Sequence, residues 1–335
     1  MTPETIRRLR SGVFPSYVLR AGFQLDVFTP LKDGALTVEQ IASAIDVDPD
    51  RLKPLLYSLV VVGLLELGGD RFSNTPEADR FLVRGRPQFM GHSLRFSFFM
   101  WEAISKTVES IRTGVPQAKF DYTSLSEEVS EFFYQIHHKD AIKTGKALME
   151  KYDFSSCRRL VDVGGGTGGL AITVAEAFPM IEATVIDLPS VTPTTKRFID
   201  EAGVSDRVKV VSADAVRDSL MGSYDVAVLK DLIQVLPRDE VRLVLRNVVD
   251  LIESGGQIFV IGQILDDSCL SPLSVVMYSL AFLNAYESGR AYTEREYRDW
   301  LEEAGFEDFQ KDSLPSGECI LVAKKRCNQV RDRDR

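Results

Sequence analysis

The chain has 335 residues, 27% of them charged, and a formal net charge of −9. This length exceeds about 250 residues, beyond which one hydrophobic core tends to split, so we expect more than one domain. The acidic balance disfavours nucleic acid and anionic membranes as partners. The four cysteines lack a CxxC spacing, and we find neither a signal-peptide pattern nor the roughly 20 apolar residues that span a bilayer. We therefore predict a cytoplasmic protein with no metal site and no membrane partner.

The first 90 residues predict a small, mostly helical domain. Thr37 and Gln40 have the spacing of a capping box, and Asp48 precedes a proline, which is typical of a second helix start. Residues 64–75 then indicate two short strands around a Gly-Gly-Asp turn, so the domain is winged-helix-like. Its second helix is rich in leucine and lacks side chains that read base edges. We expect this domain to support dimerisation and not DNA binding.

The rest of the chain predicts a helical layer followed by a sheet domain. Residues 91–150 are mainly helical and are expected to form a linker and substrate layer. From 151 to 326, apolar runs of strand length alternate with amphipathic stretches, which predicts an α/β fold with a doubly wound, Rossmann-like parallel sheet. Two last segments predict an antiparallel hairpin that completes the sheet, and residues 327–335 are expected to be disordered. The expected strands are RLVDVG, EATVID, VKVVSA, YDVAVLK and QIFVIGQIL.

A glycine-rich loop follows the first of these strands and opens a helix. In such an arrangement backbone N–H groups and a helix N-terminus face a ligand. Gly164, Gly166 and Gly169 satisfy the dinucleotide pattern GxGxxG, whereas Gly164, Gly166 and Gly168 satisfy the GxGxG that is common in methyltransferases. The glycines alone therefore leave NAD and S-adenosylmethionine both open.

Two acidic residues lie at the ends of the next two predicted strands. Asp187 is placed to hold ribose hydroxyls, and Asp214 is placed to accept a hydrogen bond from an adenine amino group. Either acid alone is equally compatible with a helix cap or a turn. Because parallel strands end at one edge of a sheet, the loop and both acids together predict a nucleotide crevice.

The order of LVDVGGGTGGLAITVAEAFP, IDLPSV, DRVKVVSADA, YDVAVLKDLIQVLPRDE and ESGGQIFVIGQIL closely resembles the S-adenosylmethionine-dependent small-molecule O-methyltransferases with an N-terminal dimerisation domain. The resemblance spans nearly the whole chain, including YDFSSCRRLVDVGGG and SGRAYTEREYRDWLEEAGF. It implies S-adenosylmethionine as cofactor, a small-molecule acceptor and a homodimer. By position, it implies contacts to the methionine and ribose region from Asp162, Gly164, Gly166 and Gly168, to the ribose from Asp187, to the adenine from Asp214 and Ala215, and a place beside the cofactor for Lys230.

The chain departs from this family where hydroxyl-methylating members usually carry a histidine. Their phrase is similar to LKxxLHDWxDE, and here Gln234 occupies the histidine position. An amide takes up no proton at neutral pH, whereas a phenol is normally helped by a base. We therefore predict an acceptor that needs no strong base. The first hypothesis is S-methylation of a thioether such as 4-methylthio-2-hydroxybutyrate, as in dimethylsulfoniopropionate synthesis, because the enzymes of that step resemble this broader fold family.

Three alternatives stay open. In the first, His137 or His138, or else His92 in the preceding helical layer, supplies the base for O-methylation of a secondary metabolite. Tyr134, Tyr278 and Tyr286 are candidates to orient the acceptor or to contact a sulfonium through a cation–π interaction. A second alternative is an enzyme that binds S-adenosylmethionine without transferring its methyl group, as in the few relatives that hydroxylate or rearrange their substrate. The third is a ligand-sensing winged-helix regulator, which the apolar second helix and the acidic chain disfavour.

Overall fold

The computed structural model describes residues 2–119, 127–315 and 317–327. The chain forms two compact units, Met1–Phe99 and Met100–Arg335. The domain boundaries that we placed at 90 and 150 stay predictions, and the predicted disordered tail lies outside the described residues except for Cys327. No helix among the described residues is long and apolar enough to cross a membrane.

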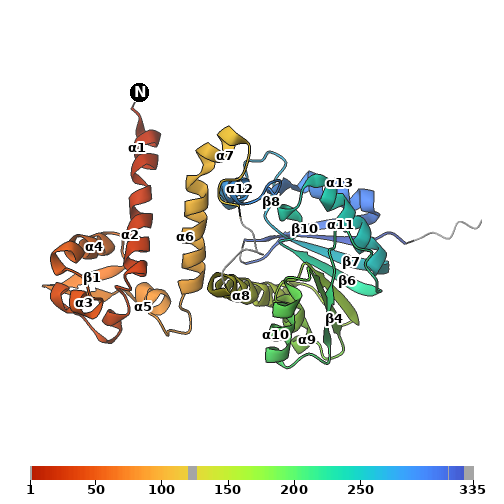
Figure 1. Ribbon diagram of the computed structural model, residues 1–335, viewed down its shortest axis with the longest axis horizontal. Helices are drawn as coiled ribbons and strands as arrows, with labels where there is room; N and C mark the ends of the chain where they lie inside the picture. The colour runs from red at the N-terminus through yellow and green to blue at the C-terminus, as the bar shows by residue number, and fades with distance from the viewer. Residues whose placement is uncertain (1, 120–126, 316, 328–335) are drawn as a thin grey trace, which may run out of the picture. The chain divides into compact units, whose positions relative to one another are not determined.

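The first unit is built from short helices and one hairpin (Figure 1). The hydroxyl of Thr37 accepts from the N–H of Gln40 while the Gln40 side chain accepts from the N–H of Thr37, so the predicted capping box is confirmed. The carboxylate of Asp48 caps the next helix. The elements are α1 (Glu4–Ser11), α2 (Val13–Gln24), η1 (Pro30–Asp33), α3 (Val38–Ala44), α4 (Pro49–Val61), β1 (Leu65–Gly68), β2 (Arg71–Asn74) and α5 (Pro76–Leu82), and α6 (Gly91–Ser105) crosses into the second unit.

The apolar face of α4 forms the centre of this unit. Leu52, Leu56 and Leu59 are three or four residues apart, so they share one helix face, and all three are buried. They pack in one cluster with Phe28 and Phe72. The leucines that we noted in the sequence are thus core residues.

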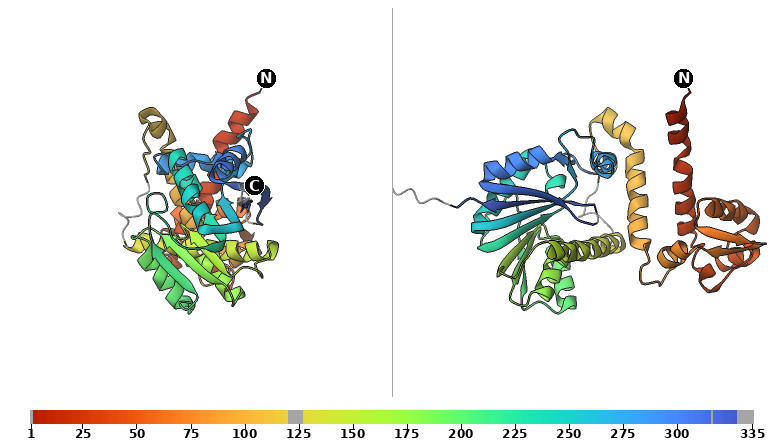
Figure 2. Two further views of the ribbon diagram at one scale, coloured as in Figure 1. Left: turned by 90° about the vertical axis from the view of Figure 1, so that its right-hand side faces the viewer. Right: turned by 180° about the vertical axis from the view of Figure 1, so that it is seen from behind.

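The second unit is a sheet with helices on both faces (Figures 1 and 2). Its strand order is β10-β11-β7-β6-β3-β4-β5, and only the pairs made by β11 are antiparallel. This confirms the predicted doubly wound sheet and its closing hairpin. The elements are α7 (Thr107–Thr113), α8 (Glu127–Lys151), β3 (Arg159–Val163), α9 (Gly169–Ala177), β4 (Glu182–Asp187), α10 (Thr192–Ala202), β5 (Val208–Ser212), β6 (Tyr224–Lys230), η2 (Ile233–Val235), α11 (Arg238–Leu251), β7 (Ile252–Gly262), β8 (Ile264–Leu265), α12 (Leu273–Ala285), β9 (Tyr292–Thr293), α13 (Glu294–Ala304), β10 (Phe306–Ser313) and β11 (Cys319–Lys325).

The two faces of the sheet bury separate hydrophobic clusters. On one face the core includes side chains of α11 and α13, such as Val244 and Trp300. On the other it includes side chains of α8, α9 and α10, such as Leu148, Val174 and Phe198. Burial on both faces is why the strands read as continuous apolar runs in the sequence.

The strand order reverses between β3 and β6. The chain proceeds from β3 outward through β4 to β5, and then returns to pair β6 with the other edge of β3. In doubly wound sheets, ligands bind in the crevice outside the carboxyl ends of the strands at such a reversal. The glycine loop after β3 and Lys230, at the end of β6, both lie at this point.

Candidate active site

The loop between β3 and α9 is shaped by its glycines. Gly164, Gly166 and Gly168 have φ of 70°, 57° and 73°, a region that other residues rarely adopt. Gly165 is needed for a different reason: a Cβ there would lie 2.6 Å from Cγ of Asp162 and 2.9 Å from Cγ1 of Val185. The loop therefore closes tightly over the end of β3.

Asp162 is buried beneath this loop with spare hydrogen-bonding capacity. The residue is 1% exposed, and its Oδ1 has no hydrogen-bond partner among the described residues. Burial, together with the nearby charge of Asp187, raises its pKa to about 7, against the opposing effect of Lys230. A buried acceptor atom without a donor fits a ligand that brings an ammonium or another N–H group.

Asp187 ties the end of β4 to the glycine loop. Its Oδ2 accepts from the N–H of Gly166 at 2.7 Å, and its Oδ1 accepts from the N–H of Leu188 at 2.7 Å. Burial raises its pKa above the ordinary value, although both hydrogen bonds oppose this. Each carboxylate oxygen keeps a lone pair for a ligand hydroxyl.

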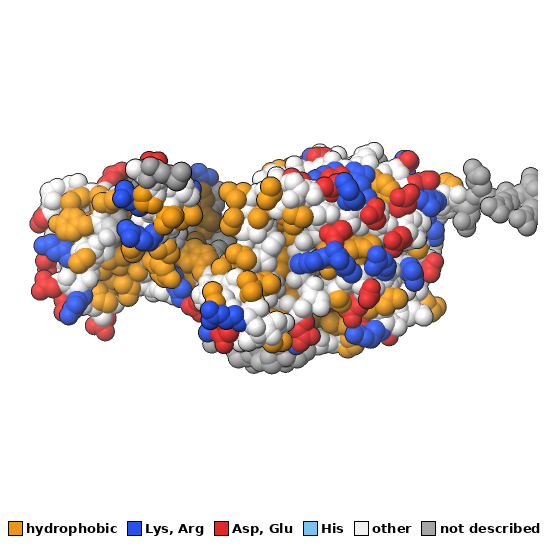
Figure 3. Space-filling view, turned by 90° about the horizontal axis from the view of Figure 1, so that it is seen from above, with side chains coloured by type: hydrophobic (Ala, Val, Ile, Leu, Met, Phe, Trp, Pro, Cys, Tyr) orange, Lys and Arg blue, Asp and Glu red, His pale blue; other side chains and the backbone are white. Residues whose placement is uncertain are grey.

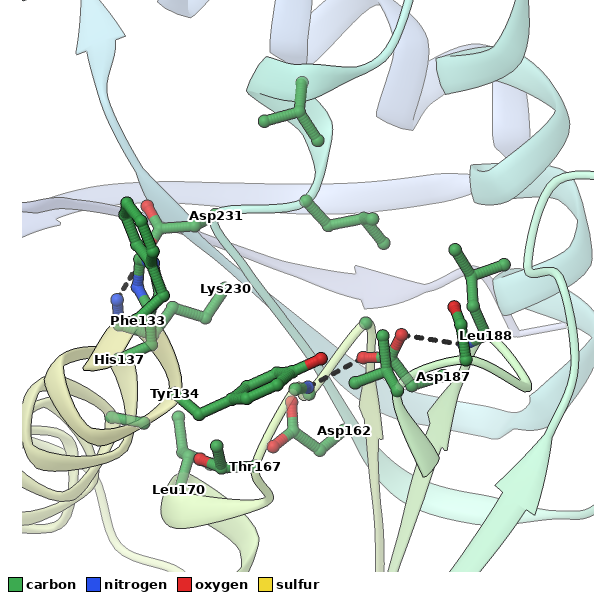
Figure 4. A pocket seen from close by; sticks show the side chains of 18 of the residues that line it. Phe133, Tyr134, His137, Asp162, Thr167, Leu170, Asp187, Leu188, Lys230 and Asp231 are labelled. Carbon is green, nitrogen blue, oxygen red and sulfur yellow. Dashed lines mark hydrogen bonds and ion pairs between the residues drawn. The ribbon is translucent and has the colours of Figure 1, made fainter. Parts of the chain in front are cut away.

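Asp162 and Asp187 line one cavity of about 560 Å³, which lies within the range of small-molecule and cofactor sites (Figure 4). Lys230 and Asp231 line it as well, and so do Tyr134 and His137 from α8. The remaining lining residues are Lys119, Phe133, Ala141, Gly164, Gly165, Gly166, Thr167, Leu170, Leu188, Ser190, Val191, Leu232 and Val235.

Three of the residues expected to contact the cofactor do not line this cavity. Gly168 is the N-cap residue of α9, and Ala215 packs against the core cluster of the α11 face. Asp214 accepts from the N–H of Val216 at 2.9 Å and pairs with Arg217 at 2.6 Å. Partial burial acts to raise the pKa of Asp214, but these hydrogen bonds outweigh it and the pKa is lowered. Its adenine contact stays a prediction.

Lys230 lies among three carboxylates. Its ammonium is 2.8 Å from Asp140 and 3.1 Å from Glu318, and it also pairs with Asp231. The side chain is 10% exposed; burial would lower its pKa, but the three acids raise it well above the ordinary value. The sequence shows Asp231 only as a neighbour of Lys230, and nothing in it brings Asp140 or Glu318 to this place.

Gln234 does not face the cavity. It is 6% exposed, its Oε1 accepts from the N–H of Gln263 at 2.7 Å, and its Nε2 donates to Oδ1 of Asp231 at 2.9 Å. Both ends of the amide are therefore used within the protein. Gln234 is a support for Asp231, so the sequence-based inference from this residue to the acceptor has no structural basis.

The two adjacent histidines of α8 lie in different surroundings. His137 lines the cavity, and burial lowers its pKa. Nδ1 of His138 is 2.9 Å from the hydroxyl of Thr167, and its ring stacks on Phe198. Burial lowers the pKa of His138 too. His138 thus braces the glycine loop, whereas His137 faces the ligand space.

The three candidate tyrosines also separate. Tyr134 lines the cavity, and burial raises its pKa. Tyr278 and Tyr286 pack against Phe282 in a small cluster formed by α12 and its C-cap, and the Tyr278 hydroxyl points to Sδ of Met100 at 3.4 Å. Burial raises the pKa of Tyr278. Neither of these two residues lines the cavity, and their contact with an acceptor stays a prediction.

Comparison with known proteins identifies the family. Residues 105–307 match the O-methyltransferase domain, and residues 8–84 match the O-methyltransferase dimerisation domain, so the chain belongs to the O-methyltransferase family. It is 28% identical to the 3-hydroxy-5-methyl-1-naphthoate 3-O-methyltransferase of Streptomyces sahachiroi, over 90% of this chain and 89% of that one. It is 27% identical to the N,N-dimethyltransferase OxyT of Streptomyces rimosus, over 96% of this chain and 96% of that one.

A solved structure has the same fold. Human N-acetylserotonin methyltransferase, in complex with S-adenosylmethionine, superposes with a TM-score of 0.78 at 24% identity, over 96% of this chain and 97% of that one. Family, fold and glycine loop together make this chain an S-adenosylmethionine-dependent methyltransferase. The predicted cofactor is thereby confirmed, and NAD is excluded.

The residues present fit this cofactor. The orphaned Oδ1 of Asp162 suits its ammonium group, the free lone pairs of Asp187 suit its ribose hydroxyls, and the cavity volume suits a molecule of its size. In contrast, the thioether acceptor is not supported. The two relatives above are named for transfer to oxygen and nitrogen, and the glutamine that led to the sulfur hypothesis lies outside the cavity.

Proposed function

We propose that this enzyme methylates a hydroxyl group of a small secondary metabolite and that His137 is the base. The observation that carries the proposal is the contrast between two residues: His137 lines the cavity, and Gln234 is buried behind it with both amide ends engaged. Phe133, Leu232 and Val235 add apolar surface to the same cavity, which suits an aromatic or otherwise apolar acceptor.

The residues have distinct tasks in this mechanism. The bound cofactor supplies a methyl group already activated by its positive sulfur. Asp162 and Asp187 hold the cofactor, and the apolar wall keeps water from the acceptor. Because its pKa is lowered by burial, His137 is neutral at pH 7 and able to accept the hydroxyl proton as the oxygen bonds to the methyl group. With the cofactor bound, the proton would end on the imidazole and an electron pair of the acceptor oxygen would form the new O–C bond, while the cofactor's sulfur would keep the electron pair of the broken S–C bond.

The proposal is tested with labelled S-adenosylmethionine and separate panels of phenols, aliphatic alcohols, amines and thioethers. Labelled product is expected from the phenol panel. Label found only in the thioether or amine products would overturn the proposal, and the thioether result would restore the sulfur hypothesis.

The base is tested by His137→Gln, with His138→Gln as the matched variant on the same helix. His137→Gln is expected to lower kcat by about 100-fold or more while leaving the affinity for S-adenosylmethionine unchanged. His138→Gln is expected to act mainly on cofactor affinity, because it loosens the brace on Thr167. Full activity of His137→Gln on a phenol would exclude His137 as the base.

We also propose that the enzyme is a homodimer. The matched dimerisation domain begins at residue 8, and α1 and α2 expose large apolar side chains, which are Ile6, Leu9, Val13, Phe14 and Tyr17. Exposed apolar side chains gather on the second unit as well (Figure 3), including Val108 and Ile111 of α7 and Leu273 and Met277 of α12. Exposed apolar side chains that gather within one unit are typical of protein interfaces. Sedimentation should give a dimer, and the double variant Leu9→Asp, Phe14→Asp should give a monomer.

A further inference from the structure

The turn that follows β6 holds Asp231 in an unusual conformation. Its φ is 56°, in the left-handed region, and its N–H donates to the carbonyl oxygen of Ile261 at 2.9 Å. Aspartate tolerates this conformation better than most residues, but it persists only where the surroundings enforce it. Asp231 directly follows β6, and in this backbone conformation its side chain lies in the wall of the cavity.

The carboxylate of Asp231 is also fixed. A backbone N–H can only donate, so the bond from Gln263 to Gln234 defines Oε1, and the other end of the amide must be the NH₂ that donates to Asp231. Lys230 holds the second carboxylate oxygen. Two donors thus orient Asp231, and one of them is the residue at the family's usual histidine position.

The charge of Asp231 is only partly neutralised. Lys230 is shared with Asp140 and Glu318, so three carboxylates surround one ammonium. Glu318 is further held by the hydroxyl of Thr144 at 3.1 Å. A net negative charge therefore remains at this end of the cavity, where it stabilises a neighbouring cation.

His137 is that neighbour. His137 and Asp140 are three residues apart on α8 and so share one helix face, and Asp140 contacts Lys230. Figure 4 shows His137 and Asp231 on the same side of the cavity, opposite Asp187. The charged groups that act on the imidazole are Asp231 and Lys230 from the end of β6 and Asp140 from its own helix; both acids raise its pKa.

We propose that Asp231, held by Gln234, is a positioning residue that orients the imidazole of His137 towards the acceptor and stabilises its protonated form. The proton leaves the acceptor hydroxyl for the imidazole, and the resulting cation faces a fixed carboxylate. Gln234, at the family's usual histidine position, thus supports Asp231. Asp231 is in turn the partner of His137, a base on α8. This inference rests on the proposed role of His137.

The first experiment measures the pKa of His137 in the cofactor-free protein by NMR, which needs no acceptor. The chain has three histidines, and His137→Gln assigns the resonance. Asp231→Asn is expected to lower the pKa of His137 by about 1, whereas Asp140→Asn should lower it less, because Asp231 acts on it more strongly. Asp239→Asn, on the exposed surface, is the control and should change nothing. An unchanged or raised value in Asp231→Asn would overturn the proposal.

The second experiment tests the support from Gln234. Gln234→Leu keeps the volume of the side chain and removes both hydrogen bonds, so Asp231 loses one of its two donors. The pKa of His137 should fall in the same direction as in Asp231→Asn but by a smaller amount. A pKa equal to that of the wild type would show that Gln234 does not position Asp231.

A kinetic experiment separates this inference from the proposed function. With an accepted phenol, Asp231→Asn should lower kcat about 10-fold and shift the acid limb of its pH profile, with KM for S-adenosylmethionine unchanged. If His137→Gln is fully active, the proposed base is wrong. If His137→Gln is inactive but Asp231→Asn has the wild-type pH profile, only the role of Asp231 is wrong.

Discussion

The carboxylate of Asp187 joins the end of one strand to the loop that follows the neighbouring strand, because its Oδ2 accepts from the N–H of Gly166 at 2.7 Å. Gly166 belongs to the loop after β3, and Asp187 ends β4. The cavity lies against this junction, which is also held by a backbone hydrogen bond from the N–H of Gly164 to the carbonyl oxygen of Ile186 at 2.8 Å.

Replacing Asp187 by alanine should weaken S-adenosylmethionine binding by about 10- to 100-fold. The variant loses the predicted ribose contact and also the hydrogen bond to Gly166 of the loop, and hydrogen bonds to a charged group contribute about 1.5–3 kcal/mol. Isothermal titration calorimetry measures this. Asp267→Ala, an exposed partner of Arg295, is the control. Equal affinities for Asp187→Ala and the wild type would contradict the site described here.

Gly165→Ala should lower both stability and cofactor affinity. Its Cβ would approach Asp162 and Val185 to less than 3.0 Å, and such overpacking costs about 1–3 kcal/mol. Gly68→Ala is a matched control, since nothing lies within 4 Å of a Cβ at that position. Thermal unfolding and calorimetry of both variants make the comparison. An unaltered Gly165→Ala would show that the loop has more room than its geometry indicates.

The raised pKa of Asp162 should make the stability of the cofactor-free protein depend on pH. Its folded pKa of about 7 exceeds the ordinary 3.8, so the folded state binds the extra proton and stability is lost as pH rises through this interval. Asp162→Asn should lack this part of the loss. Denaturant unfolding between pH 5 and 8 measures the difference, and the same pH dependence in both proteins would contradict it.

Cofactor affinity should change with pH in the opposite direction. Only the ionised carboxylate of Asp162 pairs with an ammonium group, so the affinity for S-adenosylmethionine should rise as pH increases through about 7. Calorimetry at several pH values tests this, with Asp162→Asn as the variant that should bind weakly throughout. A pH-independent affinity in the wild type would exclude this pairing.

Lys230→Met should destabilise the protein by about 3 kcal/mol at pH 8, because three acids lose their shared cation. Three neighbouring negative charges then repel one another without a counter-ion, and acid relieves that repulsion, so the loss should be smaller at pH 5 than at pH 8. Lys32→Met, an exposed lysine, should change stability by less than about 0.5 kcal/mol. A loss that does not vary with pH would contradict the electrostatic explanation.

The sequence predicted the strands well because their side chains are buried on both faces. Val161, Val185 and Val228 lie in strands whose central residues are buried and mostly apolar, a pattern that needs no knowledge of distant contacts. Asp187 was found for a related reason: it ends such a run, and parallel strands end together.

Gln234 shows where this reasoning failed. Gln234 stands at the position of the histidine in the family's sequence motif. The direction of its side chain, however, depends on Gly262, where a Cβ would lie 2.5 Å from Oε1 of Gln234. This close approach and the N–H of Gln263 turn the amide away from the cavity. A local phrase carries no information about such contacts from β7.

From the sequence alone, the family and the cofactor could be predicted, because the family's phrases recur along nearly the whole chain. The edge of the sheet at which the cofactor is expected to bind could be predicted too, because a glycine pattern and apolar periodicity are local properties. The tertiary structure alone decided which polar groups face the cavity. It brought Asp140 of α8, Asp231 of the turn after β6 and Glu318 next to β11 to one lysine, and it placed His137 among the lining residues. These groups are far apart in the chain, and only the packing of α8 and β11 around the end of β6 brings them together.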